Sequence, residues 1–194
     1  SPHLKDFRER IKVNGEMASE QFVIDFTEKI QPLSEQIKPS FFEITVAMAF
    51  DYFLEQKVDI AIIEVGLGGR LDSTNIILPE LSVITNIGMD HMNLLGESLE
   101  KIATEKAGII KKVVPLVIGE VLPENLHVFE KAAMEKNAPL SIATHARMAE
   151  EWKWENNELH VTVTNKPDEP VIYRLDLPGI YQVKNLLTVL ETCS

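Results

Sequence analysis

Apolar residues recur at helical spacing in two segments near the start of the chain. From Ser19 to Ile37, apolar positions such as Phe22 and Phe26 lie four residues apart, and Ser19 can cap the first turn. Pro32 is expected to kink or end this helix. A second helix is predicted from Ser40 to Gln56, where a serine followed three residues later by a glutamate is typical of a helix start.

The middle of the chain alternates apolar runs with helical patterns. Val58 to Val65 is continuously apolar apart from two acidic positions, which predicts a strand buried on both faces. Further strands are predicted at Leu81 to Ile87, Val113 to Ile118 and Pro139 to Ala143, with helices at about 98–110 and 123–137 between them. This β-α-β-α-β order indicates a parallel sheet with right-handed crossovers.

The alternation of predicted strands and helices ends after about His145. Residues 152–177 alternate apolar and polar side chains between Asn-rich and Pro-rich turns, which predicts an antiparallel ribbon at the edge of the sheet. A last helix is predicted from Tyr181 to Thr192. The fold class expected is α/β: a Rossmann-like or P-loop-type three-layer domain with a mostly parallel sheet and an antiparallel edge ribbon.

Nucleotide-binding folds of this class usually open with a strand and a glycine-rich phosphate loop. The chain begins instead with SPHL, which reads as the close of a strand, and its last residues read as the inside of a helix. We therefore expect residues 1–194 to be a fragment of a longer enzyme, cut at both ends and lacking the first phosphate-loop unit. Such a fragment is expected to be inactive by itself and to self-associate through exposed sheet surface.

Composition limits the partners of the protein. The formal net charge of −11 over 194 residues argues against nucleic acid, because binding to a phosphate backbone needs a basic face. A nucleotide remains compatible, since backbone N–H groups and a divalent cation can bind phosphate in an acidic protein. The single cysteine fits a reducing cytosol, and no apolar run approaches the roughly 20 residues that span a bilayer.

Polar residues follow the predicted strand ends, where ligands bind in open parallel sheets. Glu64 interrupts an apolar strand, and an ionised carboxylate buried there needs a metal or an ion pair. His91 follows the next strand, with Asp90 able to orient it. The glycine-rich segment 66–70 matches neither the dinucleotide fingerprint nor a Walker A loop, so it is either a structural turn or a ligand-binding loop.

Lys106 lies among apolar and small residues after a predicted helix. A lysine amine that is desolvated becomes nucleophilic and can capture CO2 as a carbamate, which is an anionic oxygen ligand. The alternative is an ordinary surface lysine beside Glu105. The residues alone permit both.

Six blocks of the chain carry a family resemblance. SPHLKDFRERIKVNG, SFFEITVAMAF, EVGLGGRLDSTN, ITNIGMDH, EKAGIIK and LPGIYQVKN resemble, in this order, the signature segments of the folylpolyglutamate synthase and dihydrofolate synthase family. That family is a branch of the Mur ligase superfamily. The resemblance implies an ATP-dependent ligase that joins L-glutamate to folate or dihydropteroate through an acyl phosphate, requires Mg²⁺ and is monomeric, with residues 1–194 as its central ATP-binding domain, truncated at both ends. The charge, the apolar-run length and the single cysteine described above add the expectation of a cytoplasmic protein with neither nucleic acid nor membrane as a partner.

The resemblance also implies roles for individual residues. Glu64 and His91 look like Mg²⁺ ligands, and Lys106 looks like the carbamylated lysine that binds a second metal; these three form the catalytic set. The pterin-side wall would comprise Phe41, Phe42, Arg70, Asp72 and Ser73. The nucleotide contacts would comprise Asn86 near the phosphates and Gln182 and Asn185 near adenine.

Two other functions stay open at this point. One is a cell-wall or cyanophycin-type ligase of the same superfamily, with a different acceptor. The other is a non-catalytic module that keeps the fold. The sequence does not distinguish one synthase activity from both, and it does not identify the preferred folate.

Overall fold

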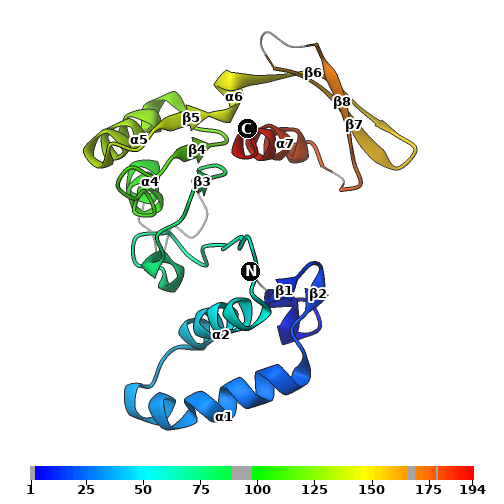
Figure 1. Cartoon of the computed structure of the whole chain (residues 1–194). Coiled ribbons are helices and arrows are strands. Elements are labelled where there is room, and N and C mark those ends of the chain that lie inside the picture. Colours follow the sequence, from blue (N-terminus) through cyan, green and yellow to red (C-terminus); the bar gives the residue numbers. More distant parts are fainter. Residues whose placement is uncertain (1–2, 89–97, 166–168, 178) are drawn as a thin grey trace. The chain divides into compact units, whose positions relative to one another are not determined.

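The computed structural model describes residues 3–88, 98–165, 169–177 and 179–194. The chain divides into two compact units. The first comprises Ser1–Leu67 and Leu71–Ile77; the second comprises Gly68–Arg70 and Leu78–Ser194. The elements are labelled in Figure 1. No helix within the described ranges is long and apolar enough to cross a membrane.

The first unit is mainly helical. After the 3-10 helix η1 (Phe7–Arg10), the short strands β1 (Lys12–Val13) and β2 (Glu16–Met17) pair as an antiparallel hairpin. Helices α1 (Glu20–Ile37) and α2 (Phe41–Gln56) follow side by side in Figure 1, and η2 (Ser73–Ile76) completes the unit. The core consists of Ile11, Ala18, Phe22, Phe26, Met48 and Tyr52.

Both predicted helix starts are confirmed. The Ser19 hydroxyl accepts a hydrogen bond from the Phe22 backbone N–H at 3.1 Å. Ser40 and Glu43 form a complete capping box, because each side chain accepts a hydrogen bond from the backbone N–H of the other. α1 continues through Pro32, so the proline does not end the helix.

The strand predicted from Val58 to Val65 is wrong. The segment is assigned no strand, and Ile60 and Ile62 are 84% and 92% exposed. An apolar run becomes a buried strand only when neighbouring strands and helices cover it, and within the described part of the first unit no strand pairs with this one. The interruption by Glu64 is therefore not a buried charge.

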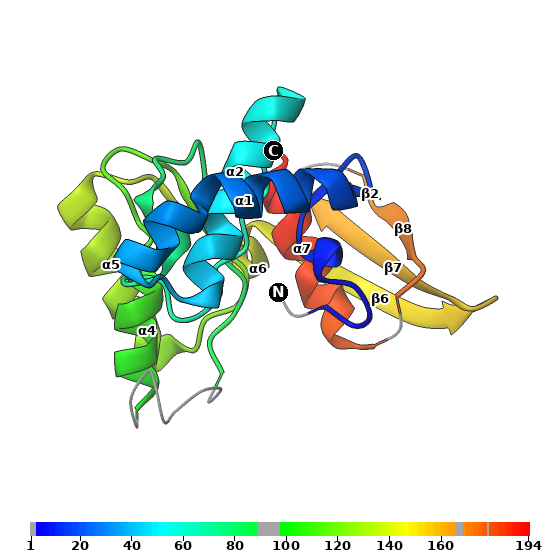
Figure 2. The same cartoon turned by 90° about the horizontal axis from the view of Figure 1, so that it is seen from below.

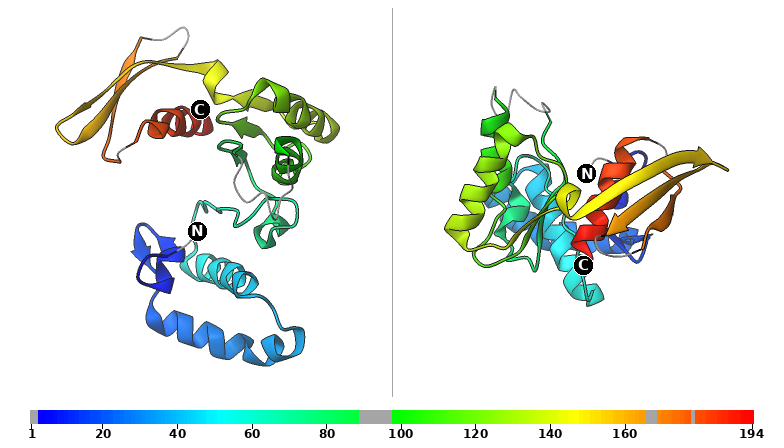
Figure 3. Two further views of the ribbon diagram at one scale, coloured as in Figure 1. Left: turned by 180° about the vertical axis from the view of Figure 1, so that it is seen from behind. Right: turned by 90° about the horizontal axis from the view of Figure 1, so that it is seen from above.

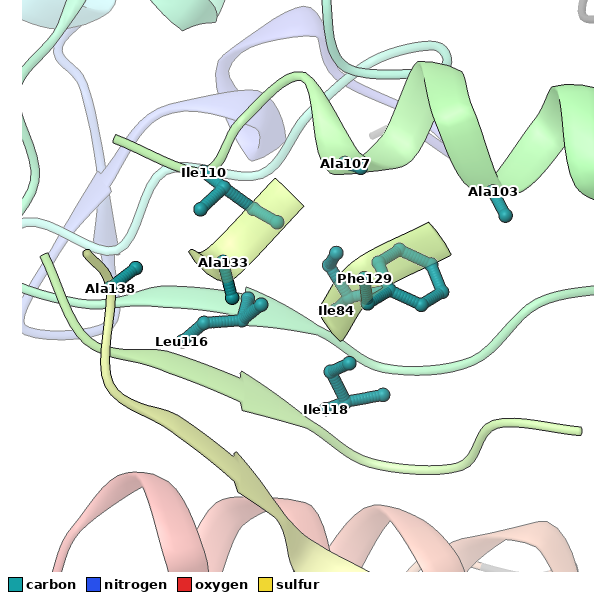
Figure 4. Packing of buried hydrophobic residues seen from close by; sticks show 9 residues of the cluster. All are labelled: Ile84, Ala103, Ala107, Ile110, Leu116, Ile118, Phe129, Ala133 and Ala138. Atoms are coloured by element: carbon teal, nitrogen blue, oxygen red, sulfur yellow. The ribbon is translucent and has the colours of Figure 1, made fainter. Parts of the chain in front are cut away.

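The second unit contains the parallel sheet. Strands β3 (Ser82–Ile84), β4 (Leu116–Ile118) and β5 (Leu140–Ile142) pair in that order, and helices α4 (Leu99–Ala107) and α5 (Pro123–Lys136) connect them. Figure 4 shows both helices over one face of the sheet, packed on Ile84, Leu116 and Ile118. Phe129 of α5 is fully buried there. The predicted β-α-β-α-β order is confirmed, with shorter strands than expected.

The ribbon and the last helix form the other half of this unit. After the short helix α6 (Ala143–Ala146), strands β6 (Arg147–Glu155), β7 (Glu158–Asn165) and β8 (Val171–Leu175) pair antiparallel in sequence order. The predicted antiparallel ribbon is confirmed, but it makes a separate sheet and does not pair with the edge of the parallel sheet. The buried face of β7 packs on α7 (Tyr181–Thr192), as Figures 1 and 2 both show.

Helix α7 also covers the opposite face of the parallel sheet from α4 and α5, which gives three layers (Figures 3 and 4). Near its C-terminus the largely buried Glu191 accepts hydrogen bonds from two other elements. Ser141 of β5 donates its hydroxyl to one carboxylate oxygen, and Arg147 of β6 donates Nε to the other at 3.0 Å. The last turn of α7 is thereby bonded to both sheets.

Candidate functional site

The loop that follows the extended segment 58–65 is organised by Asp72. One carboxylate oxygen accepts hydrogen bonds from the backbone N–H of Thr74 at 2.9 Å and from its hydroxyl at 2.6 Å. The other accepts from the backbone N–H of Leu67 at 2.8 Å. Asp72 thus caps η2, whose first residue is the half-buried Ser73, and closes the loop on itself.

Glu64 and Phe42, two of the predicted site residues, line one cavity of about 190 Å³ in the first unit. Half of its lining residues come from α2, and apolar side chains alternate with the polar groups of Glu9, Arg10, Thr45, Glu64 and Thr74. Backbone N–H groups of Leu4 and Asp6 donate to the Glu9 carboxylate and lower its pKa. Glu64 is exposed, so its expected burial is wrong, and its carboxylate is accessible to a ligand.

The ring of Phe42 presses against the backbone of Gly66. A Cβ atom at position 66 would lie 2.4 Å from Cζ of Phe42, which is far inside van der Waals contact. A side chain at position 66 would therefore force the Phe42 ring or the loop to move.

Phe41 is 59% exposed at the first turn of α2. Its ring meets Phe7 edge to face at 5.6 Å between centroids, and the guanidinium of Arg10 lies 5.6 Å from the ring centroid. Arg10 in turn donates Nε to Nδ1 of His3 at 2.9 Å. An exposed aromatic ring held in this way can bind a planar ligand.

Arg70 contacts helix α4 in the second unit. Its Nε and Nη2 donate to one carboxylate oxygen of Glu105, at 3.1 and 2.9 Å, and its backbone N–H donates to the Glu105 carbonyl at 2.9 Å. Glu105 directly precedes Lys106, which is half-buried in the last turn of α4. The sequence analysis named Glu105 only as a possible ion-pair neighbour of Lys106. Its position next to that lysine was the one feature that could have pointed to a role in the site.

The carboxyl ends of β3 and β4 lie beside α7. The backbone N–H of Glu120, just after β4, donates to the Thr85 carbonyl at 3.0 Å, and the Glu120 carboxylate pairs with Lys184 of α7. Asn86 is exposed in the loop next to Thr85. This is the edge of a parallel sheet at which ligands bind.

Gln182 and Asn185 face each other one turn apart on α7. The Asn185 amide donates to the Gln182 side-chain carbonyl at 3.0 Å, so the two predicted adenine contacts form one polar pair. Both side chains are half-buried. Sequence reasoning missed the Glu120–Lys184 pair beside them, because ion pairs between distant elements leave no local pattern.

The predicted metal ligands are only partly described. His91 lies outside the described residues. Glu64 belongs to the first unit and Lys106 to the second. Among the described residues, no group of three histidine, cysteine or acidic side chains is arranged to hold a metal ion. The convergence of Glu64, His91 and Lys106 stays a prediction.

Comparison with known proteins gives a consistent result. Residues 14–193 match the model of the Mur ligase middle domain. A dihydrofolate synthase/folylpolyglutamate synthase from Bacillus subtilis is 47% identical over 146 residues, which cover 72% of this chain and 34% of that protein.

Solved structures agree with the sequence match. A folylpolyglutamate synthase from Thermotoga maritima is 37% identical with a TM-score of 0.86, over 100% of this chain and 45% of that one. A complex described as FPGS–AMPPCP–folate is 29% identical with a TM-score of 0.90, over 99% of this chain and 48% of that one. The chain thus spans about half the length of these structures, and it belongs to the Mur ligase family as a middle domain, in the branch of the folylpolyglutamate and dihydrofolate synthases.

Proposed function

We propose that the protein acts as an ATP-dependent ligase that adds L-glutamate to folates, as a folylpolyglutamate synthase and in addition as a dihydrofolate synthase if it accepts dihydropteroate. The observation that carries the proposal is the similarity over 99% of the chain to a folylpolyglutamate synthase solved with an ATP analogue and folate. The proposal concerns the natural protein that contains this sequence.

The reaction has two chemical steps. A carboxylate oxygen of the folate attacks the γ-phosphorus of ATP, and ADP leaves. The glutamate nitrogen then attacks the acyl carbon, phosphate leaves, and the amine gives up a proton as the amide forms. Both steps depend on positioning and on charge stabilisation more than on covalent chemistry by the protein.

The described residues can be given roles in these steps. The exposed Phe41 ring and the cavity beside Phe42 would bind the planar pterin end of the folate, with Ser73 and the Asp72 loop at its border. Asn86 would lie near the phosphates. The amide pair Gln182–Asn185 would hydrogen-bond the adenine edge.

Magnesium fits the chemistry of these residues. Mg²⁺ commonly binds one or two carboxylates together with phosphate oxygens and water, and Glu64 is an accessible carboxylate of this kind. His91 and a carbamylated Lys106 are the further ligands that we propose. Bound Mg²⁺ would supply Lewis-acid stabilisation of the anionic phosphoryl and acyl groups.

Turnover of defined acceptors tests the proposal. The natural protein is incubated with ATP, L-glutamate and either tetrahydrofolate or dihydropteroate, and the glutamylated product and ADP are measured by chromatography and mass spectrometry. Transfer of ¹⁸O from the labelled folate carboxylate to phosphate would report the acyl phosphate. Glu64→Gln is expected to lower the rate at least about 100-fold, whereas the matched change Glu80→Gln at another exposed glutamate should leave it unchanged.

The alternatives are part of the same experiment. ADP release that depends on a cell-wall precursor or a cyanophycin-type acceptor, and not on folates, would identify a ligase of another branch. Absence of ATP turnover with every acceptor would indicate a non-catalytic module. We further propose that the natural protein is monomeric and that it is cytoplasmic, since its single cysteine fits a reducing compartment.

A further inference from the structure

The pairing of Arg70 with Glu105 joins the glycine-rich loop to the lysine-bearing end of α4. The two residues make three hydrogen bonds: two from the guanidinium to the carboxylate and one between their backbones. The Glu105 side chain is 24% exposed. Both guanidinium donors share one oxygen of Glu105, and the backbone bond adds a further point of attachment between the two residues.

The backbones also meet directly. A Cβ atom at Gly108, the residue that ends α4, would lie 2.3 Å from Cβ and 2.4 Å from Cα of Arg70. Only a glycine allows this approach. The loop therefore rests on the main chain of the helix end, and not merely on the tip of one side chain.

The contact between Arg70 and Glu105 lies at the C-terminal end of α4, where the backbone carbonyls of a helix need hydrogen-bond donors from outside it. Carbonyls in the last turn of an α-helix lack the regular intrahelical partner, and the Glu105 carbonyl, which lies in this turn, accepts a capping bond from the Gly108 N–H at 3.2 Å. The Arg70 backbone N–H adds a shorter hydrogen bond at 2.9 Å, and the arginine cation is favourable beside the negative end of the helix dipole. Both effects order the turn that carries Lys106.

We infer that Arg70 is a positioning residue for Lys106, acts through Glu105, and does not contact the folate. The inference rests on the proposed function for its kinetic readout, and it reassigns a residue that the family resemblance put in the pterin-side wall. The 35-residue separation between Arg70 and Glu105 explains why the sequence alone did not relate them.

Steady-state kinetics of the natural protein test the inference. The variants are Arg70→Met, which keeps the aliphatic stem, Glu105→Gln, which keeps the shape, and the double variant. Each single change should lower kcat by about 10- to 100-fold with KM for folate unchanged within about twofold. The double variant should be no slower than the slower single variant, because both changes break one interaction.

The matched controls are Glu100→Gln, in the first turn of the same helix, and Arg174→Met on β8. Both should retain kcat. If Arg70→Met raises KM for folate while Glu105→Gln does not, or if the two losses multiply, Arg70 acts on the substrate and the inference is overturned. Should Arg70→Met fail to fold, Arg70→Lys replaces it, with the same expected loss.

A second readout does not need activity. The rate at which a lysine-acetylating reagent modifies Lys106 is measured by mass spectrometry in each variant, with the exposed Lys101 of α4 as the internal standard. Arg70→Met and Glu105→Gln should change the Lys106 rate by the same factor, at least about threefold, and leave Lys101 unchanged. Unchanged Lys106 labelling would overturn the inference. Changed labelling in a protein that ligates no folate would overturn only the proposed function.

Discussion

Asp72 holds Thr74 by two hydrogen bonds to a single carboxylate oxygen, one from the backbone N–H and one from the hydroxyl. The second oxygen accepts a hydrogen bond from the backbone N–H of Leu67, which lies within the glycine-rich segment 66–70. The aspartate is therefore the structural centre of the loop, whatever it contributes to a ligand.

Replacing this carboxylate is expected to destabilise the chain. Asp72→Ala removes the cap of η2 and leaves the Leu67 and Thr74 N–H groups without their acceptor, so the free energy of unfolding should fall by about 1 to 2 kcal/mol. Urea unfolding followed by circular dichroism measures the loss. Asp59→Asn, at an exposed aspartate of the same unit, is the control; an equal loss in both variants would contradict the role of Asp72.

Gly66→Ala should be destabilising because of Phe42. The new methyl would lie 2.4 Å from the ring, so either the ring or the loop must move. We expect a loss of about 1 to 3 kcal/mol, typical of overpacking. In a Phe42→Leu background the smaller side chain leaves space, and Gly66→Ala should then cost less than half as much. An undiminished cost would show that the loop backbone, and not the ring, excludes the methyl group.

The N-terminal segment should lose stability in acid because of Asp6. Hydrogen bonds from the side chain and then the backbone of Arg8 lower the pKa of Asp6 from its ordinary value of 3.8 to about 2. Since the folded-state pKa is the lower one, the stabilisation is complete above about pH 3.8 and disappears as the pH falls through about 2.

Melting temperatures between about pH 5 and pH 2 measure this effect. Asp6→Asn and Arg8→Met should both reduce the decline of melting temperature over that range, since each removes the pair that shifts the pKa. If Arg8→Met declines as steeply as the unchanged chain, another acidic group is responsible.

The exposed isoleucines predict self-association of the 194-residue chain. Ile60 and Ile62 are exposed on an extended segment that pairs with no strand in the described part of the chain, and such segments template pairing between molecules. Ile60→Lys with Ile62→Lys should shift the sedimentation profile toward monomer. Ile24→Lys, at a half-exposed isoleucine on α1, is the control and should not do so. A chain that is already monomeric at about 100 μM would contradict the prediction.

Local patterns predicted the helices well. The caps at Ser19 and Ser40 and the last helix from Tyr181 to Thr192 depend on residues a few positions apart, and the structure agrees with them. The two-residue strands β1 and β2 were missed, since so short a hairpin has no hydrophobic period. The prediction of a buried strand at 58–65 is wrong because burial depends on neighbouring strands and helices, which the residues of the segment do not specify.

The candidate site was predicted unevenly for the same reason. Sequence motifs identified Phe42 and Glu64, which share a cavity, and the amides of Gln182 and Asn185, which bond to each other. They did not identify the partners of Arg70 and Asp72, because those hydrogen bonds depend on how the loop folds back on itself and on α4. Residue types indicated the chemistry, whereas the structure was needed to separate supporting residues from those open to a ligand.

The hydrogen bonds of Glu191 to both Ser141 and Arg147 affect how the second unit unfolds. Helix α7 packs in the core of the antiparallel sheet and is bonded at its last turn to both sheets, so opening either sheet breaks a bond of Glu191. Amide hydrogens of β4 and β7 should therefore exchange with solvent at similar, slow rates, as parts of a single cooperative block.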